Sequence, residues 1–240
     1  MSDDSRFPIP DSQNLLVVNL GVLPYGPALD LQRDVARRVI EREIATDVLL
    51  LVEHPPVVTL GRTSKGANLL ASPAFLRERG VELYEVERGG DVTFHGPGQL
   101  VGYPIIDLKR HRQDLHWYLR QVEEALIRTL SVFGIPAERS TGQTGVWTNG
   151  RKIASIGVHA REWVTWHGFA LNVSTDLSFF DMIVPCGIAG VTMTSIERER
   201  AAATSIDVVA DAVVDAFSQV FALAAHRADA SVLSAAAITR

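Results

Sequence analysis

The sequence predicts an α/β fold, a mixed β-sheet flanked by helices in a single domain. Runs of β-branched residues and leucine alternate with longer segments whose apolar residues recur at helical spacing. The alternation follows no strict order, which favours a mixed sheet over a regular parallel one. No internal repeat or low-complexity linker divides the 240 residues, a length that can bury a sizeable core as one unit.

The predicted strands are short apolar runs bounded by proline, glycine or polar residues. The clearest is DVLLLVE at residues 47–53, which Pro55 and Pro56 separate from the next run. The predicted strands cover residues 14–20, 47–53, 57–60, 81–88, 99–106, 152–160 and 166–173.

Three amphipathic segments predict helices at residues 28–44, 114–133 and 207–224. The third begins with a pattern close to a capping box, because Thr204 stands three residues before Asp207.

The chain is predicted to have one main domain with short additions at both ends. Residues 1–12, with Pro8 and Pro10, are expected to be a mobile leader. Residues 13–225 form the main domain. The alanine-rich tail, residues 226–240, is expected to extend the last helix or to fray.

Composition excludes several classes of function. The net charge of -5 argues against nucleic-acid binding. No apolar run approaches the roughly 20 residues of a membrane span, and the N-terminus has no signal-sequence pattern, so we expect a cytoplasmic protein without membrane contact. A single cysteine allows no internal disulfide and no multi-thiolate zinc site. We further expect a monomer.

Nucleotide and metal motifs have no positive support. Residues 145–152, GVWTNGRK, have the glycine spacing of a P-loop, but Arg151 stands where lysine is required and Lys152 where Ser or Thr would bind magnesium. Neither G-x-S-x-G nor H-E-x-x-H occurs. We therefore expect no cofactor and no metal.

A glycine-rich segment and a lysine-bearing strand stand out as candidate sites. Residues 88–99, RGGDVTFHGPGQ, can form a backbone concavity for an anion, or a plain turn with His95 in the core. Lys152 heads the mostly apolar row of a predicted strand, where its ammonium needs a partner unless it reaches solvent from the strand end.

Cys186, the only cysteine, lies in a turn between Pro185 and Gly187. Lone cysteines are more often buried as small apolar side chains than catalytic. The turn setting favours a reactive thiol, and thiol chemistry needs a thiolate, which a nearby ammonium stabilises. Lys152, one of three lysines, is the candidate partner, although the sequence does not show that the two side chains meet.

Together these segments resemble the lipoyl(octanoyl) transferases, the cysteine-dependent branch of the biotin/lipoate protein ligase-like catalytic fold. The resemblance spans about residues 14–200. The matching segments are residues 53–62, 88–99, 152–157, 167–172 and 183–188, in the family's order.

The resemblance implies an enzyme that moves an octanoyl group from octanoyl-acyl carrier protein to a specific lysine of apo-lipoyl domains, in 2-oxoacid dehydrogenase complexes or the glycine cleavage H protein. It implies that Cys186 carries the acyl group as a thioester and that Lys152 lowers the pKa of its thiol. Ser155 replaces the alanine usual in the family, which adds a hydroxyl and keeps the backbone role. The implied acyl and substrate site comprises Arg88, Gly89, Gly90, Asp91, Val92, Thr93, Phe94, His95, Ser155, Ile156, Gly157, Gly168, Phe169 and Ala170.

The implied reaction agrees with elementary chemistry. Thioester exchange is nearly isoenergetic and the final amide is more stable, so no ATP is required, and covalent catalysis divides the transfer into two easier steps. Partners of this kind are usually acidic. An acidic enzyme must therefore gather arginine locally, and the candidates are Arg62, Arg88, Arg151 and Arg161.

Three alternatives remain open at this point. An ATP-dependent lipoate or biotin ligase on the same fold needs no catalytic cysteine. A cysteine hydrolase would release the acyl group to water, with His95 or His167 as base. A non-catalytic acyl-binding module would use Cys186 only for packing.

Overall fold

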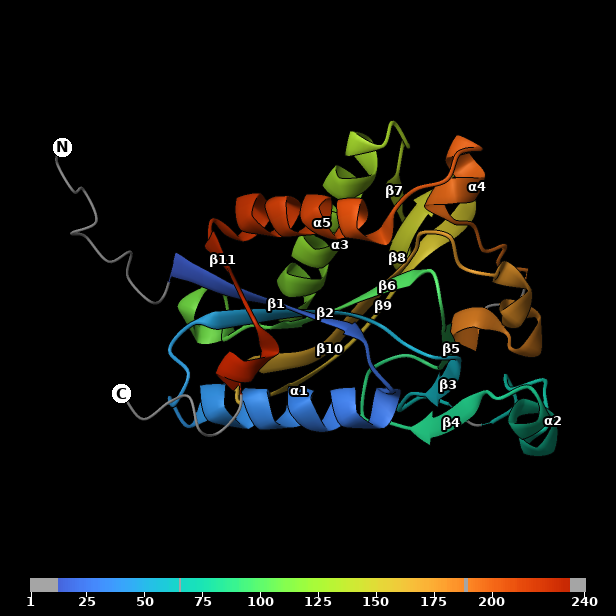
Figure 1. Ribbon diagram of the computed structural model, residues 1–240, viewed down its shortest axis with the longest axis horizontal. Coiled ribbons are helices and arrows are strands. Elements are labelled where there is room, and N and C mark those ends of the chain that lie inside the picture. The colour runs from blue at the N-terminus through green and yellow to red at the C-terminus, as the bar shows by residue number, and fades with distance from the viewer. Residues whose placement is uncertain (1–12, 65, 188–189, 234–240) are drawn as a thin grey trace, which may run out of the picture.

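The computed structural model describes residues 13–64, 66–187 and 190–233, without the side chain of Cys186. In this part of the chain an eight-stranded sheet forms the centre, and a three-stranded sheet lies at one end of it (Figure 1). The predicted mixed sheet flanked by helices is confirmed. The predicted leader, residues 1–12, lies outside the described residues.

The large sheet has the strand order β11-β1-β2-β6-β10-β9-β8-β7, and the small sheet has the order β4-β3-β5. The strands of the large sheet are β1 (Asn14–Val22), β2 (Asp47–Glu53), β6 (Gln99–Ile105), β7 (Glu138–Ser140), β8 (Gln143–Thr148), β9 (Arg151–Arg161), β10 (Val164–Asn172) and β11 (Ala224–Ala228). Those of the small sheet are β3 (Val57–Leu60), β4 (Glu82–Glu85) and β5 (Val92–His95).

The sheet is mixed because β2 has one parallel and one antiparallel neighbour. β2 pairs in parallel with β1 and antiparallel with β6. The uninterrupted apolar run of β2 is buried almost throughout, as expected of a strand covered on both faces.

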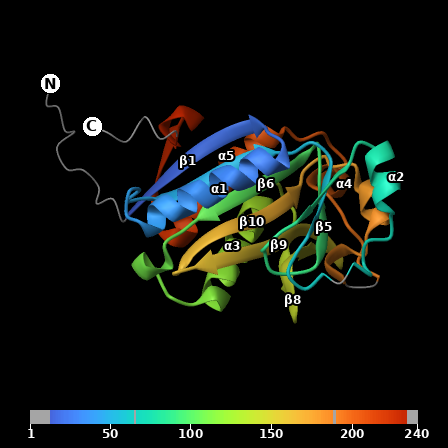
Figure 2. The same ribbon diagram turned by 90° about the horizontal axis from the view of Figure 1, so that it is seen from below.

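Helices cover both faces of this sheet. α3 (Leu115–Val132) and α5 (Ile206–Phe221) pack on one face around the larger core cluster, and α1 (Tyr25–Ile40) covers the other face (Figures 1 and 2). The short helices are α2 (Pro73–Glu78), α4 (Ile196–Arg200), η2 (Leu108–Arg110), η3 (Leu177–Met182), η4 (Pro185–Gly187) and η5 (Ala230–Leu233).

Helix ends follow capping chemistry that the sequence revealed only in part. The Asp114 carboxylate accepts a hydrogen bond from the Trp117 amide and begins α3. The start of α5 differs from the prediction, because Ser205 rather than Thr204 is the cap and accepts from the Asp207 amide. α1 begins at Tyr25, earlier than expected, and places that tyrosine in the core.

The prediction that the tail extends the last helix or frays was wrong for residues 226–228. Residues Ala224–Ala228 form β11, which pairs in parallel with β1, and η5 follows. The free edge of β1 explains the difference, because its unpaired backbone groups offer more hydrogen bonds than an isolated helix extension. No helix in the described part of the chain is long and apolar enough to cross a membrane.

Candidate active site

A pocket opens where the segment before β5 covers the face of β9 and β10. The Gly89 amide donates to the Val158 carbonyl at 2.8 Å and fastens this segment to β9. The empty space of the pocket is about 470 Å³, a volume that includes space open to solvent. Its lining is Tyr25, Arg88, Gly89, Gly90, Asp91, Val92, Thr93, His95, Val101, Tyr103, Ser155, Ile156, Gly157, His167, Gly168, Phe169 and Ala170.

The structure brings the three predicted binding segments together. All predicted substrate-site residues except Phe94 line the pocket. Phe94 points into a separate core cluster instead. Its ring stacks on that of Phe179, with 4.8 Å between the ring centres, and meets the Phe180 ring edge-on. The alternation of side chains along β5 explains this placement, because Thr93 and His95 occupy the opposite face.

The strand glycines serve close backbone packing. A side chain at Gly157 would come within 2.9 Å of the Gly89 carbonyl oxygen, and one at Gly168 would collide with the Gly102 carbonyl. Glycine at these two positions therefore lets the loop and the strands approach one another and build the wall of the pocket.

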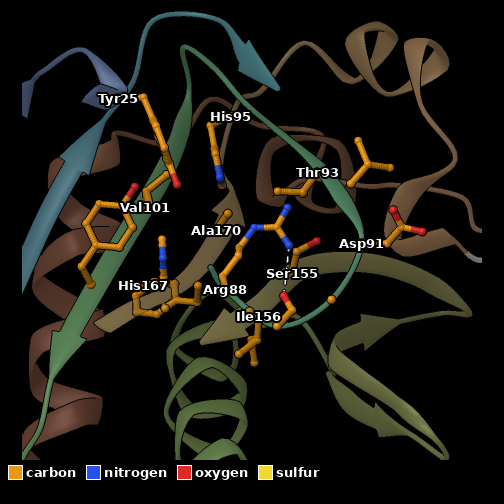
Figure 3. Close-up of a pocket in the computed structure, with 17 residues that line it drawn as sticks. Tyr25, Arg88, Asp91, Thr93, His95, Val101, Ser155, Ile156, His167 and Ala170 are labelled. Carbon is orange, nitrogen blue, oxygen red and sulfur yellow. Dashed lines mark hydrogen bonds between the residues drawn. The ribbon is translucent and has the colours of Figure 1, made fainter. Parts of the chain in front are cut away.

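Arg88 extends across the middle of the pocket (Figure 3). Its Nη2 donates to the Thr59 carbonyl at 2.8 Å and to Thr59 Oγ1 at 2.9 Å, and its Nη1 donates to the Gly89 carbonyl at 3.1 Å. With 7% of its surface exposed, the guanidinium is a fixed positive charge inside the pocket and not a surface contact. This corrects its assignment as a docking arginine.

Tyr25, His95 and His167 lie toward one end of the pocket, and Asp91 lies at the other (Figure 3). His95 Nδ1 lies 2.8 Å from Gln99 Oε1. The side-chain nitrogen of Gln99 in turn donates to Asn172 Oδ1 at 2.9 Å. This arrangement assigns the His95 proton to Nδ1. Burial, followed by the nearby His54, lowers the pKa of His95 to about 3, so the ring is neutral near pH 7.

His54 and Tyr103 form a second buried pair beside this end of the pocket. His54 Nδ1 lies 2.6 Å from the Leu23 carbonyl, so the proton is on Nδ1, and the Tyr103 hydroxyl donates to Nε2 at 2.7 Å. Burial lowers the pKa of His54 to about 4. Burial likewise raises the pKa of Tyr25 to about 12. These side chains are therefore uncharged near neutral pH.

The side chain of Glu87 lies beside His167, at the same end of the pocket. Its carboxylate accepts from Arg33 at 2.6 Å and from Trp166 Nε1 at 2.9 Å, and it lies 3.7 Å from His167 Nε2. The contact with His167, followed by that with Arg33, holds the pKa of Glu87 well below its usual range. Burial lowers the pKa of His167, although Glu87 opposes this shift.

Lys152 is 1% exposed and lies at the start of β9. Its Nζ donates to the Thr144 carbonyl at 3.1 Å and lies 5.4 Å from the centre of the Trp147 ring. The side chain is buried, so the alternative of a lysine reaching solvent is wrong.

The backbone of the segment that carries Cys186 abuts the pocket. Cys186 lies in η4, and its side chain is outside the described part of the structure. A side chain at the next residue, Gly187, would come within 2.5 Å of Asp91 Oδ2, which Asn68 also contacts at 2.5 Å. Asp91 lines the pocket, so η4 packs at its rim. Contact between the Cys186 and Lys152 side chains stays a prediction.

The other predicted docking arginines differ in their surroundings. Arg151 pairs with Glu199 at 2.8 Å, whereas Arg62 and Arg161 are exposed. In the described part of the chain no group of three or more acidic, histidine or cysteine side chains could hold a metal ion.

Sequence reasoning missed Tyr25, Val101 and Tyr103 as lining residues, and considered His167 only as a possible base. Val101 and Tyr103 alternate along β6 on the face that meets the pocket. This period could have singled them out once β6 was known to lie beside β10. Tyr25 carried no such signal, because its position depends on how α1 docks.

Comparison with known proteins identifies similar chains. The family described as the lipoyl protein ligase A/B catalytic domain matches residues 24–218. An octanoyltransferase of Nostoc sp. is 47% identical over 214 residues, which cover 89% of this chain and 95% of that protein. An octanoyltransferase of Acidobacterium capsulatum is 52% identical over 198 residues, covering 77% of this chain and 80% of that one.

Solved structures with the same fold are more distant in sequence. A lipoate-protein ligase A bound with ATP has a TM-score of 0.75 at 16% identity, covering 94% of this chain and 92% of that one. The bipartite lipoate protein ligase of Thermoplasma acidophilum has a TM-score of 0.69 at 17% identity, covering 94% of this chain and 89% of that one. At these identities the likeness concerns the fold alone.

Proposed function

We propose that this chain, which belongs to the lipoyl protein ligase A/B family and to its octanoyltransferase branch, carries octanoyl as a thioester on Cys186. Membership makes the chain an acyltransferase of protein lipoylation. The proposed donor is octanoyl-acyl carrier protein. The proposed acceptors are lysines of apo-lipoyl domains in 2-oxoacid dehydrogenase complexes and in the glycine cleavage H protein.

The pocket is the observation that carries this proposal. Segments around Arg88, Ser155 and Gly168, far apart in the sequence, converge on one cavity, and η4 packs at its rim through Asp91. The acyl chain would lie in this cavity with its carbonyl toward η4. The neutral ring of His95 at the inner end suits an apolar chain better than a charged ring would.

The proposed reaction consists of two successive acyl transfers. The Cys186 thiolate attacks the thioester carbonyl of the donor, and the carrier thiol leaves with a proton. The ε-amine of the acceptor lysine then attacks the Cys186 thioester, forms the amide and returns the sulfur as thiolate, and the amine proton passes to a base. No bond is oxidised or reduced, and no nucleotide is consumed.

Lys152 is the proposed partner of the thiol in both steps. As an ammonium it would stabilise the thiolate and give a proton to the departing carrier thiol. Its burial supports this role, because a lysine with 1% exposure needs a compensating anion or hydrogen bonds. Backbone amides near Gly157 or Gly187 are the proposed donors to the oxyanion. Arg62 and Arg161 are the proposed contacts for the acidic partner proteins.

Intact-mass measurement tests the covalent step. The wild-type protein incubated with octanoyl-acyl carrier protein is expected to gain one octanoyl group, which hydroxylamine removes. The Cys186→Ser variant is expected to gain no thioester. A wild-type protein that never gains mass while amide still forms on the acceptor would exclude the thioester.

Alkylation kinetics test Lys152. The Lys152→Met variant keeps the length of the buried side chain without its charge, and its Cys186 is expected to react with iodoacetamide about tenfold more slowly at pH 7, the effect of roughly 1.4 kcal/mol. Lys109→Met, on η2, serves as the control. Equal rates in the wild type and both variants would remove Lys152 from this role.

The same assays distinguish the proposed transferase from a hydrolase and from an ATP-dependent ligase. A hydrolase would release octanoate as fast without acceptor as amide forms with it. His95 is poorly suited as its base, because a pKa of about 3 lies far below the operating pH. An ATP-dependent ligase would attach free octanoate in the presence of ATP and would tolerate Cys186→Ser.

A further inference from the structure

We propose that Glu123 is a positioning residue for Lys152 and acts through the peptide group between Thr144 and Gly145. The inference rests on the proposed function, since it concerns the lysine assigned to the thiol. Glu123 lies on α3, and the peptide lies on β8, beside the start of β9.

One peptide group connects the two side chains. Its N–H, from Gly145, donates to Glu123 Oε1 at 3.2 Å. Its carbonyl, from Thr144, accepts from Lys152 Nζ at 3.1 Å. The N–H and C=O of a trans peptide point in opposite directions. The carboxylate on one side therefore fixes the direction in which the carbonyl meets the ammonium on the other.

Glu123 is built into the interior as a charged group. It is 0% exposed, its Oε2 accepts from Arg120 Nη1 at 2.5 Å, and the same oxygen forms an ion pair with Arg139 Nε at 3.2 Å. Both carboxylate oxygens are thus occupied by donors. Both arginine side chains are exposed, whereas the carboxylate that they pair with is buried.

The conformation of Gly145 is a second observation that supports a specific fit between this peptide and the Lys152 side chain. Its φ of +135° is a conformation that favours glycine, and a Cβ there would come within 2.7 Å of Lys152 Cε. The lysine side chain therefore occupies the space that any other residue would fill.

The charged groups around Lys152 come from several elements. Glu123 and Arg120 approach from α3 and Arg139 from β7, while the neighbouring Arg151 pairs with Glu199 of α4. Among these described side chains, only Glu123 contacts the peptide that Lys152 binds. Without an acceptor for the buried Gly145 N–H, the peptide can rotate and turn the Thr144 carbonyl away from Nζ.

The test compares Glu123→Met with Glu124→Met. Methionine keeps the length of the side chain and removes both acceptors. Glu124 is a matched control, because it also binds Arg139, at 2.7 Å, but the structure gives it no bond to the Gly145 peptide. Thermal unfolding of both variants shows whether each is folded.

The first readout is the NMR signal of the lysine ε-methylene groups. The chain has three lysines, so the spectrum is simple, and Lys152→Met assigns the signal. Lys152 Nζ lies near the Trp147 ring, and its ε-methylene is expected to carry a ring-current shift. Glu123→Met is expected to move this signal toward the other two lysines, and Glu124→Met to leave it in place.

The second readout is the rate of octanoyl transfer from octanoyl-acyl carrier protein to Cys186. Glu123→Met is expected to lower the rate about tenfold to a hundredfold with the donor KM unchanged, because the pocket is untouched. A folded Glu123→Met variant with both the wild-type signal and the wild-type rate would overturn the inference. Absence of acyl transfer in the wild type would refute the proposed function instead, and the NMR comparison would still test the positioning.

Discussion

His54 shows how a single buried side chain fixes the charge of its surroundings. Both ring nitrogens are hydrogen-bonded, Nδ1 to Leu23 and Nε2 to Tyr103, and the side chain has no exposed surface. Its pKa in the folded protein is about 4, below the ordinary value of 6.5. The unfolded chain therefore binds a proton below about pH 6.5 that the folded protein does not take up until about pH 4. The free energy of unfolding falls across this window as the pH is lowered.

Replacing this histidine with glutamine is expected to remove part of that acid sensitivity. In His54→Gln, the amide can still donate to the Leu23 carbonyl and accept from Tyr103, but it does not titrate. Between pH 7 and pH 5 the variant is expected to lose about 2 kcal/mol less of its unfolding free energy than the wild type. Urea denaturation at the two pH values measures this difference. His116→Gln, at an exposed position of α3, is the control, and an identical loss in all three proteins would contradict the account.

At the scale of elements, β10 gives the pocket both its wall and its depth. Gly168 allows β10 to approach β6, and Ala170, paired with Val101 across the same two strands, presents a small side chain to the cavity. Because β10 also pairs with β9 along most of its length, its backbone has little freedom to retreat from a larger side chain. A substitution on its pocket face therefore changes the volume of the cavity.

Ala170→Leu is expected to shorten the acyl chain that the pocket accepts. The added atoms occupy space along the strand face, so transfer of octanoyl is expected to fall about tenfold or more, while transfer of butanoyl falls less. Acyl carrier proteins loaded with four- and eight-carbon chains measure the ratio of the two rates. Thr129→Ser, buried on α3 away from the pocket, is the control for general perturbation. A loss of equal size for both chain lengths would contradict this placement of the acyl chain.

At the scale of the whole molecule, local sequence patterns predicted the individual helices and strands better than they predicted how these elements pair and pack. The run from Asp47 to Glu53 became β2 because its apolar pattern is dictated locally. β7 and β8 carry no comparable signal, and the partner that turns Ala224–Ala228 into β11 is more than 200 residues away. The candidate site follows the same division. Glycine-rich segments identified the pocket lining, whereas Glu123 could not be singled out, because its role depends on how α3 packs against β8.

The C-terminal segment closes the fold, and its removal provides the last test. β11 pairs with the edge of β1, and the buried Arg38 donates to the Leu233 carbonyl at 2.6 Å. A chain that ends at residue 223 would expose the edge of β1 and deprive Arg38 of this acceptor. It is expected to unfold at lower urea concentration and to aggregate more readily.

The Leu233→Ala variant distinguishes the contribution of core packing to stability from the contribution of strand pairing in this segment. Leu233 is 3% exposed in the core beside α1, so its truncation is expected to cost about 2–4 kcal/mol while β11 remains paired. Val208→Ala, at an exposed position of α5, is expected to leave stability unchanged. Urea denaturation followed by tryptophan fluorescence ranks the variants. If the shortened chain were as stable as the full-length protein, β11 would not be needed to close the sheet, and the stability of the domain would reside in the strands from β1 to β10 and the helices that cover them.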